Sequence, residues 1–340
     1  MQAVVLVGGE GTRLRPLTLS APKQMLPIMG VAMLEGVLGH LALHGVDEAV
    51  LSLGYLPDRF LEAYPDGRCA GVRLRYAVEP TPLDTAGAVR FALEELELHG
   101  TFVVANGDVL TDLDVTALVG FHRRHGAEGT IALHPVEDPS RFGVVPTDEE
   151  GRVLAFVEKP PRDEAPTNLI NAGTYVFEPS FTERVPLGER VSLERVTFPE
   201  MVADGSLFAL ADDHYWLDTG TPEAFLQAHQ DILSGERSPH FVPHPVRGGN
   251  CLAPGSTVEV GAKVSGTMVD VGCRVSSGAL VEDSVLLPGA VVEEGAIVIG
   301  SILGPDSLVG AGAVLRPTTV LGARARVAPH SEIIDGRIEA

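Results

Sequence analysis

The sequence predicts an α/β fold: a Rossmann-like, mostly parallel sheet, followed by a parallel β-helix. Two observations predict this arrangement. Strand-like and helix-like stretches alternate through residues 1–235, and a repeat of constant length fills residues 250–330. Between the two parts, residues 236–249 hold three prolines and two glycines, a composition typical of a linker. We therefore expect two domains joined by that linker.

The first part alternates between strand and helix. Short runs rich in apolar and β-branched residues predict strands at residues 3–7, 48–53, 73–78 and 101–104. Helical patterns lie between them, for example at residues 33–44 and 85–98. This order predicts a mostly parallel sheet with helices on both faces. Ligands of such sheets bind beyond the carboxyl ends of the strands.

The second part repeats every 17 residues. Three aliphatic columns and one glycine column keep this period: Leu252, Val269, Leu286, Leu303 and Val320; Val258, Val275, Val292 and Val309; Val264, Val281, Val298 and Leu315; Gly261, Gly278, Gly295 and Gly312. Three short strands per turn around an aliphatic core predict a triangular parallel β-helix, and the six-residue subrepeat resembles the hexapeptide repeat of left-handed β-helices. Arg326 stands where the next aliphatic residue is expected, so we expect the solenoid to fray or be capped there.

Bulk properties exclude several classes of protein. The chain has 340 residues and a net charge of −21, which argues against a nucleic-acid or anionic-membrane partner. Its three cysteines are widely spaced and form no CxxC pair, so neither a disulfide framework nor a zinc site is indicated. The N-terminus does not read as a signal peptide, and no apolar run is long enough to span a bilayer. These features predict a cytoplasmic location.

A glycine-rich loop follows the first predicted strand. It lies in the stretch VVLVGGEGTRLRPLT at residues 4–18, and PKQMLP follows at residues 22–27. Glycines let backbone N–H groups approach a phosphate, and Arg13, Arg15 and Lys23 could meet its charge. The loop lacks the Gly-Lys-Ser/Thr of a Walker A motif, and Leu14 replaces the last glycine of a dinucleotide fingerprint. Taken alone, such a loop is as often only a tight turn.

The whole string is more specific, because GGxGTRLRPLT followed by PKxxLP resembles the signature of the sugar-1-phosphate nucleotidylyltransferases. The resemblance covers residues 1 to about 235, with the main motifs in order. It implies that Arg13 and Lys23 are catalytic cations beside the phosphates. It also implies nucleotide contacts from the first strand and its loop, namely from Leu6, Gly8, Gly9, Gly11 and Thr12.

Two carboxylates are candidate metal ligands. Asp108 follows the strand at residues 101–104, and Asp218 lies in the stretch YWLDTGTP at residues 215–222. Taken alone, the first is more often a plain turn aspartate, and a helix N-cap explains Thr221 better than Asp218. The resemblance implies that both aspartates bind Mg²⁺ together, and that Asp108 also contacts the nucleotide.

The resemblance assigns roles to four further motifs. E-K-P contributes Glu158 and Lys159 to the sugar phosphate, where Lys159 is catalytic, although such a triplet is most often plain surface. N-A-G and F-G-V contribute Asn171, Gly173 and Gly143 to the sugar pocket. L-D-T-A-G contributes Thr85 and Gly87 near the base and ribose, and there Asp84 replaces the usual glycine. This departure weakens any inference about the base.

The context of several motifs is most similar to the mannose-1-phosphate guanylyltransferases, notably FHRRHG at residues 121–126, INAG at 170–173 and FPEM at 198–201. The resemblance implies transfer of a nucleotidyl group from GTP to mannose 1-phosphate, with Mg²⁺ as cofactor. Glucose-1-phosphate thymidylyl-, uridylyl- and adenylyltransferases, or a non-catalytic regulatory paralogue, remain open alternatives. An acyltransferase β-helix is disfavoured because no histidine lies between Cys251 and Val327. The exposed ends of a β-helix favour a homo-oligomer.

Overall fold

The structure is a computed structural model that describes residues 1–238 and 242–340. Residues 239–241 of the predicted linker lie outside the described residues. By its internal contacts the chain forms two compact units. Unit 1 comprises Met1–Gly9 and Val37–Trp216, and unit 2 comprises Glu10–Gly36 and Leu217–Ala340. The signature segment at residues 10–36 therefore belongs to the same unit as the C-terminal repeat.

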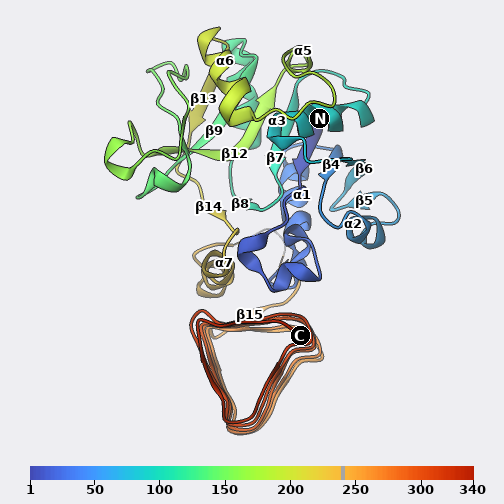
Figure 1. Ribbon diagram of the computed structural model, residues 1–340, viewed down its shortest axis with the longest axis vertical. Helices are drawn as coiled ribbons and strands as arrows, with labels where there is room; N and C mark the ends of the chain where they lie inside the picture. Colours follow the sequence, from blue (N-terminus) through green and yellow to red (C-terminus); the bar gives the residue numbers. More distant parts are fainter. Residues whose placement is uncertain (239–241) are drawn as a thin grey trace. The chain divides into compact units, whose positions relative to one another are not determined.

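Unit 1 contains a mixed sheet whose central strands are parallel, as the sequence predicts (Figure 1). Its strand order is β11 (Val157–Glu158), β10 (Gly143–Val144), β12 (Leu169–Phe177), β7 (Phe102–Asn106), β1 (Gln2–Leu6), β4 (Glu48–Leu53), β6 (Val72–Val78) and β5 (Arg68–Cys69). Strands β7, β1, β4 and β6 run parallel, and β12 runs antiparallel to β7. Strand β9 (Gly129–Pro135) pairs with β12 and with β13 (Leu207–Ala211).

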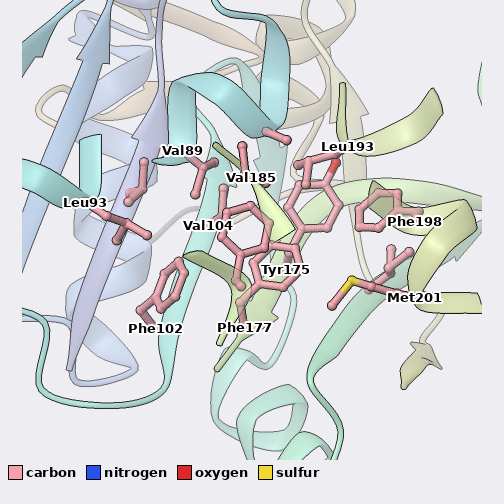
Figure 2. Packing of buried hydrophobic residues seen from close by; sticks show 14 of the residues in the cluster. Val89, Leu93, Phe102, Val104, Tyr175, Phe177, Val185, Leu193, Phe198 and Met201 are labelled. Atoms are coloured by element: carbon pink, nitrogen blue, oxygen red, sulfur yellow. The ribbon is translucent and has the colours of Figure 1, made fainter. Parts of the chain in front are cut away.

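Helices cover this sheet and complete the hydrophobic core. They are α1 (Met33–Leu43), α2 (Asp58–Ala63), α3 (Asp84–Ala92), α4 (Val115–His125), α5 (Phe181–Arg184) and α6 (Phe198–Ala203), with a π-helical turn at Leu193–Thr197. Helix α3 packs on β1, β4 and β6, and α4 packs on β9, β12 and β13. Figure 2 shows the aromatic centre of the core, where Tyr175 lies among Phe177, Phe198 and Leu193. Short strand β8 (Val109–Thr111) follows β7.

The C-terminal repeat of unit 2 is a parallel β-helix, and its stacked coils outline a triangle (Figure 1). The first side holds β15 (Val246–Arg247), β16 (Asn250–Leu252), β19 (Met268–Val269), β22 (Val285–Leu286), β25 (Ile302–Leu303), β28 (Val320–Leu321) and β31 (Arg337–Ile338). The second holds β17 (Thr257–Val258), β20 (Arg274–Val275), β23 (Val291–Val292), β26 (Leu308–Val309) and β29 (Arg326–Val327). The third holds β18 (Lys263–Ser265), β21 (Leu280–Glu282), β24 (Ile297–Ile299), β27 (Val314–Arg316) and β30 (Glu332–Ile334).

The predicted spacing of 17 residues between stacked aliphatic residues is confirmed as far as Leu315, but it is wrong for the last coil. Leu303 pairs with Leu321 instead of Val320, and Val309 pairs with Val327 instead of Arg326. One extra residue after Leu315 therefore shifts the register. The expectation that the solenoid frays near Arg326 is wrong, because paired strands continue to Ile338.

Helix α7 (Pro222–Ser234) follows strand β14 (Trp216–Asp218) and packs on β2 (Pro27–Ile28). The Gln230 amide of α7 donates a 2.7 Å hydrogen bond to the Gly266 carbonyl in the β-helix. The signature segment touches the β-helix too, since a Cβ built on Gly322 would lie 3.1 Å from the Cβ of Pro16. Among residues 1–238 and 242–340, no helix is long and apolar enough to cross a bilayer.

Candidate active site

The glycine loop and Asp108 follow neighbouring parallel strands of unit 1. Leu6, the last residue of β1, pairs with Asn106 at the end of β7, and the Gly107 N–H donates a 3.0 Å hydrogen bond to the Leu6 carbonyl. Gly8 and Asp108 each come two residues after this pair. The structure thus brings Leu6, Gly8 and Asp108 to one edge of the sheet, as the strand-end argument predicts.

A third strand end adds a carboxylate that the sequence analysis did not single out. Glu79 follows β6, and its Oε1 accepts a 2.9 Å hydrogen bond from the Ser52 hydroxyl. Its Oε2 accepts one of 2.9 Å from the Leu83 N–H. A Cβ built on Gly8 would lie 3.4 Å from Glu79 Oε1, so this carboxylate faces the start of the glycine loop. Gly9, the next residue, is exposed.

Hydrogen bonds join the L-D-T-A-G loop to the start of the π-helical turn. The Thr85 hydroxyl donates a 2.7 Å hydrogen bond to Glu194 and accepts one of 2.8 Å from the Leu193 N–H. Asp84 adopts a φ of 61°, a left-handed conformation that glycine adopts without strain. This explains why the related motif has glycine there. Here Asp84 faces Arg190, at 3.8 Å.

Gly87 is a close-packing position. Its N–H and that of Ala86 both donate to the Val191 carbonyl, over 3.0 and 2.9 Å. A Cβ on Gly87 would collide with the Glu189 carbonyl oxygen. The glycine is therefore needed so that α3 can approach this segment, whatever it contributes to a nucleotide.

The N-A-G motif sits on an irregularity of β12. The register of β12 against β9 shifts between Asn171 and Tyr175, and Gly173 has a φ of 76°. The Asn171 Oδ1 accepts a 3.0 Å hydrogen bond from the Gly173 N–H, and its Nδ2 donates one of 2.9 Å to the Tyr175 hydroxyl. A Cβ on Gly173 would lie 3.1 Å from the Asn106 Cγ, so side chains from β12 and β7 meet here.

The F-G-V and E-K-P motifs are paired strands. Gly143 of β10 pairs with Glu158 of β11, and a Cβ on Gly143 would collide with the Phe156 ring. Lys159 has a φ of 50°, rare for a residue other than glycine, and such strain is concentrated at functional sites. Its Nζ lies 3.0 Å from Glu158 Oε1, and 61% of the lysine side chain is exposed.

The rest of the signature lies in unit 2. Gly11 adopts a φ of 61°, and its carbonyl accepts a 2.9 Å hydrogen bond from the Thr18 hydroxyl. A Cβ on Gly11 would lie 3.0 Å from the Thr18 Cγ2 and 3.1 Å from the Lys23 Cβ. Thr12 begins a 3-10 turn that ends at Leu14. Residues 11–23 therefore fold back so that Thr18 and Lys23 lie against Gly11.

Arg13, Lys23 and Asp218 form one electrostatic cluster. An Nη of Arg13 lies 3.9 Å from Asp218 Oδ2, and the Asp218 Oδ1 accepts a 2.9 Å hydrogen bond from the Gly220 N–H. Burial lowers the pKa of Lys23 to about 8, with the Asp218 charge acting against this and the Arg13 charge adding to it. Desolvation thus leaves Lys23 poised to gain from an incoming anion.

The candidate metal ligands suit Mg²⁺, which needs few protein ligands, better than a metal ion that is coordinated by protein side chains alone. Within residues 1–238 and 242–340, no three His, Cys, Asp or Glu side chains are grouped as a metal site. Mg²⁺ is usually held by one or two carboxylates, while water and substrate phosphates complete its coordination. Asp108 and Asp218 each offer a carboxylate of the kind that such a site uses.

Sequence reasoning missed Glu79, Asn106 and Tyr175. Glu79 could have been found, since it directly follows a predicted strand at the ligand-binding edge. Asn106 lies two residues before the candidate metal ligand Asp108, but the sequence analysis gave it no role. Tyr175 reads as one more buried strand residue, and no local pattern signals its bond to Asn171.

Comparison with known proteins identifies the family. A model of the nucleotidyl transferase family matches residues 2–235, and a GMPPB C-terminal domain model matches residues 246–338. A mannose-1-phosphate guanylyltransferase of Mycobacterium tuberculosis is 44% identical over 276 residues, covering 80% of this chain and 76% of that protein. The catalytic subunit beta of a Dictyostelium discoideum mannose-1-phosphate guanylyltransferase is 40% identical over 242 residues, or 70% of this chain and 66% of that protein.

Solved structures agree with this assignment. The crystal structure of HddC from Yersinia pseudotuberculosis superposes with a TM-score of 0.60 at 28% identity, covering 68% of this chain and 99% of HddC. The crystal structure of HddC in complex with GMP-PN superposes with a TM-score of 0.59. The chain therefore belongs to the nucleotidyl transferase family and carries a GMPPB C-terminal domain.

Proposed function

We propose that this chain is a mannose-1-phosphate guanylyltransferase, which transfers GMP from GTP to mannose 1-phosphate and releases pyrophosphate. The observation that carries the proposal is the cluster of Arg13, Lys23 and Asp218 in the signature segment. Two cations beside one carboxylate suit a triphosphate and its metal ion. The names of the related proteins from Mycobacterium and Dictyostelium support the choice of nucleotide and sugar.

The reaction needs no protein nucleophile. A phosphate oxygen of mannose 1-phosphate attacks the α-phosphorus of GTP in line, and a new phosphorus–oxygen bond forms. The bond from the α-phosphorus to the oxygen bridging to the β-phosphate breaks, and pyrophosphate leaves with that electron pair. The main barrier is to bring two polyanions together, so positioning and charge compensation supply the catalysis.

The cations divide this task. Arg13 and Lys23 stabilise the charge that develops on the departing pyrophosphate, and Lys159 aligns the attacking phosphate. Asp108 and Asp218 would hold Mg²⁺, which when bound supplies positive charge between the reacting phosphates. Removing one such charge costs about 10²–10³ in rate. Arg13→Ala or Asp108→Ala enzyme with near wild-type turnover would contradict this division.

The base is recognised at the strand ends of unit 1. Guanine presents its N1–H and 2-amino groups as adjacent donors, and adenine has no such pair. A carboxylate can accept both, and Glu79 faces the start of the glycine loop with one bond made by each oxygen. Leu6, Gly8, Gly9, Gly11, Thr12, Thr85 and Gly87 shape the surrounding loops. Glu79 therefore supports GTP over ATP.

The sugar phosphate is held by the motifs of β10, β11 and β12. Glu158 and Asn171 offer acceptors and donors to sugar hydroxyls, while Gly143 and Gly173 let the backbone approach closely. The strained backbone of Lys159 supports a functional role for its side chain.

The assay is pyrophosphate release in the presence of Mg²⁺. GTP, UTP, dTTP, ATP and CTP are each crossed with mannose 1-phosphate and glucose 1-phosphate. Turnover with GTP and mannose 1-phosphate alone is expected. Preference for another pair would keep the reaction and change the substrates, and a folded protein silent with every pair would favour a regulatory paralogue.

We also propose a cytoplasmic homo-oligomer. Across residues 1–238 and 242–340, no disulfide joins the three cysteines, which are all buried, and this suits a reducing compartment. Among the described residues, strands β17 and β18 of the first β-helix coil have no strand partner on one side, and Val260 beside them is 95% exposed. Unpaired strand edges favour association. Light scattering after size-exclusion chromatography tests this, and a monomer at micromolar concentration would contradict it.

A further inference from the structure

The backbone of β12 is irregular where the N-A-G motif lies. Between Asn171 and Tyr175 the pairing with β9 loses register, and Gly173 in the middle takes a left-handed φ of 76°. Such bulges redirect side chains and are common beside active sites. Here the distortion brings the Asn171 amide back to the hydroxyl of a residue four positions later on the same strand.

Both ends of the Asn171 amide are fixed. Its Oδ1 accepts from the Gly173 N–H at 3.0 Å, and its Nδ2 donates to the Tyr175 hydroxyl at 2.9 Å. An asparagine amide has two donor hydrogens and two acceptor lone pairs, so one of each remains. Because the amide cannot flip without breaking both bonds, the remaining donor and acceptor have fixed positions.

Tyr175 itself is held rigidly. It is 1% exposed and packs among Phe177, Phe198 and Leu193 in the core (Figure 2). Burial, with the Glu194 charge adding to it, raises the pKa of this phenol far above its usual value. The hydroxyl is therefore neutral at any working pH. An immobile, uncharged acceptor sets the orientation of Asn171.

We propose that Tyr175 is a specificity-determining positioning residue, whose hydroxyl orients the Asn171 amide toward the hydroxyl groups of the sugar. The inference rests on the proposed function, because it assigns Asn171 to the sugar. A donor and an acceptor at fixed positions discriminate between epimers, since a hydroxyl on the wrong face leaves one of them unpaired. Mannose and glucose differ in this way at one carbon.

The test is Tyr175→Phe, which removes one oxygen without opening a large cavity. The KM for mannose 1-phosphate should rise about five- to tenfold, the effect of losing one hydrogen bond, with the KM for GTP unchanged. The preference for mannose over glucose 1-phosphate should fall by a similar factor. Equal changes in both KM values, or unchanged sugar preference, would overturn the proposal.

A matched control separates this effect from stability. Tyr76 lies in the same sheet, and its hydroxyl donates a 3.0 Å hydrogen bond to the Tyr64 carbonyl. Tyr76→Phe should lower the melting temperature similarly and leave both KM values unchanged. In an Asn171→Ala background, Tyr175→Phe should change the sugar KM less than twofold, because its effect passes through Asn171. A full additional loss in that background would contradict the positioning role.

Binding distinguishes failure of this inference from failure of the proposed function. Calorimetry with GDP-mannose and with GTP needs no turnover. Tyr175→Phe should weaken the binding of GDP-mannose by the same five- to tenfold factor and leave the binding of GTP unchanged. If the wild-type protein is inactive but binds GDP-mannose more tightly than Tyr175→Phe does, the enzymatic function is refuted and the role of Tyr175 is kept. If the wild-type protein is active and both proteins bind GDP-mannose equally well, the role of Tyr175 is refuted and the enzymatic function is kept.

Discussion

Lys23 is expected to control the alkaline side of the pH–activity profile. Its pKa is lowered to about 8 because burial disfavours the charged form, an effect that the Asp218 carboxylate only partly offsets. In the proposed mechanism, the ammonium form of Lys23 is the one that stabilises the departing pyrophosphate. The active fraction of free enzyme is therefore about 0.9 at pH 7 and about 0.1 at pH 9, so kcat/KM for GTP should fall about tenfold across this range.

The matched variant is Lys23→Arg, which keeps the positive charge at all accessible pH values. Guanine also ionises in alkaline solution, but it does so equally with both enzymes. The ratio of wild-type to variant kcat/KM therefore isolates Lys23, and this ratio should fall about tenfold between pH 7 and pH 9. A constant ratio would refute the assignment of Lys23 as the titrating group.

A direct measurement is available because the chain contains three lysines. Reductive ¹³C-methylation gives one NMR signal per lysine, and the spectrum of Lys23→Arg identifies the signal of Lys23. Its midpoint should lie near pH 8 in the free protein and should rise when GTP adds negative charge nearby. A midpoint above pH 10 would show that the side chain is not desolvated.

Three further outcomes are expected. Gly220→Ala places a Cβ 2.8 Å from Asp218 Oδ1 and against Arg13, so kcat/KM should fall about 10²–10³, whereas Gly36→Ala, with open space around it, should be neutral. His229 is fully buried and burial lowers its pKa to about 4, so the unfolded chain takes up the proton first as the pH falls below about 6.5. Between pH 7.5 and 5, urea titrations should show that His229→Leu loses about 2 kcal/mol less stability than wild type, and equal losses would contradict this. EDTA should abolish turnover without changing the melting temperature, and a large destabilisation would indicate a structural metal.

Much of the fold was predictable because its signals are local. Strand-like runs gave the central parallel strands, and a constant spacing gave the β-helix coils. The last coil was misread because strands β22, β25 and β28 on the first side each carry two adjacent aliphatic residues, as in Val320–Leu321. When one residue is inserted, a fixed period selects the wrong member of the pair. Only the structure shows that Leu321 is the residue that pairs with Leu303 in the next coil.

The motifs of the proposed site can be recognised in the sequence, but the contacts that support them cannot. The sequence identified Asn171 but gave no sign that Tyr175 orients it. It marked Asp84 as a departure from the related motif, yet the left-handed φ that explains the usual glycine is a property of the folded backbone. It also could not indicate that residues 10–36 group with residues 217–340, because that association depends on contacts between distant parts of the chain.

The discontinuity of unit 2 has a consequence for biosynthesis. The segment carrying Arg13 and Lys23 leaves the ribosome early, while α7 and the β-helix that pack with it are made last. By then, every residue of unit 1, which comprises Met1–Gly9 and Val37–Trp216, has already been synthesised. Arg13 and Lys23, the proposed phosphate-binding cations, therefore lack their packing partners until translation is nearly complete. A ribosome that stalls before α7 releases a chain with a folded sheet and no organised signature loop, which is a substrate for chaperones and proteases.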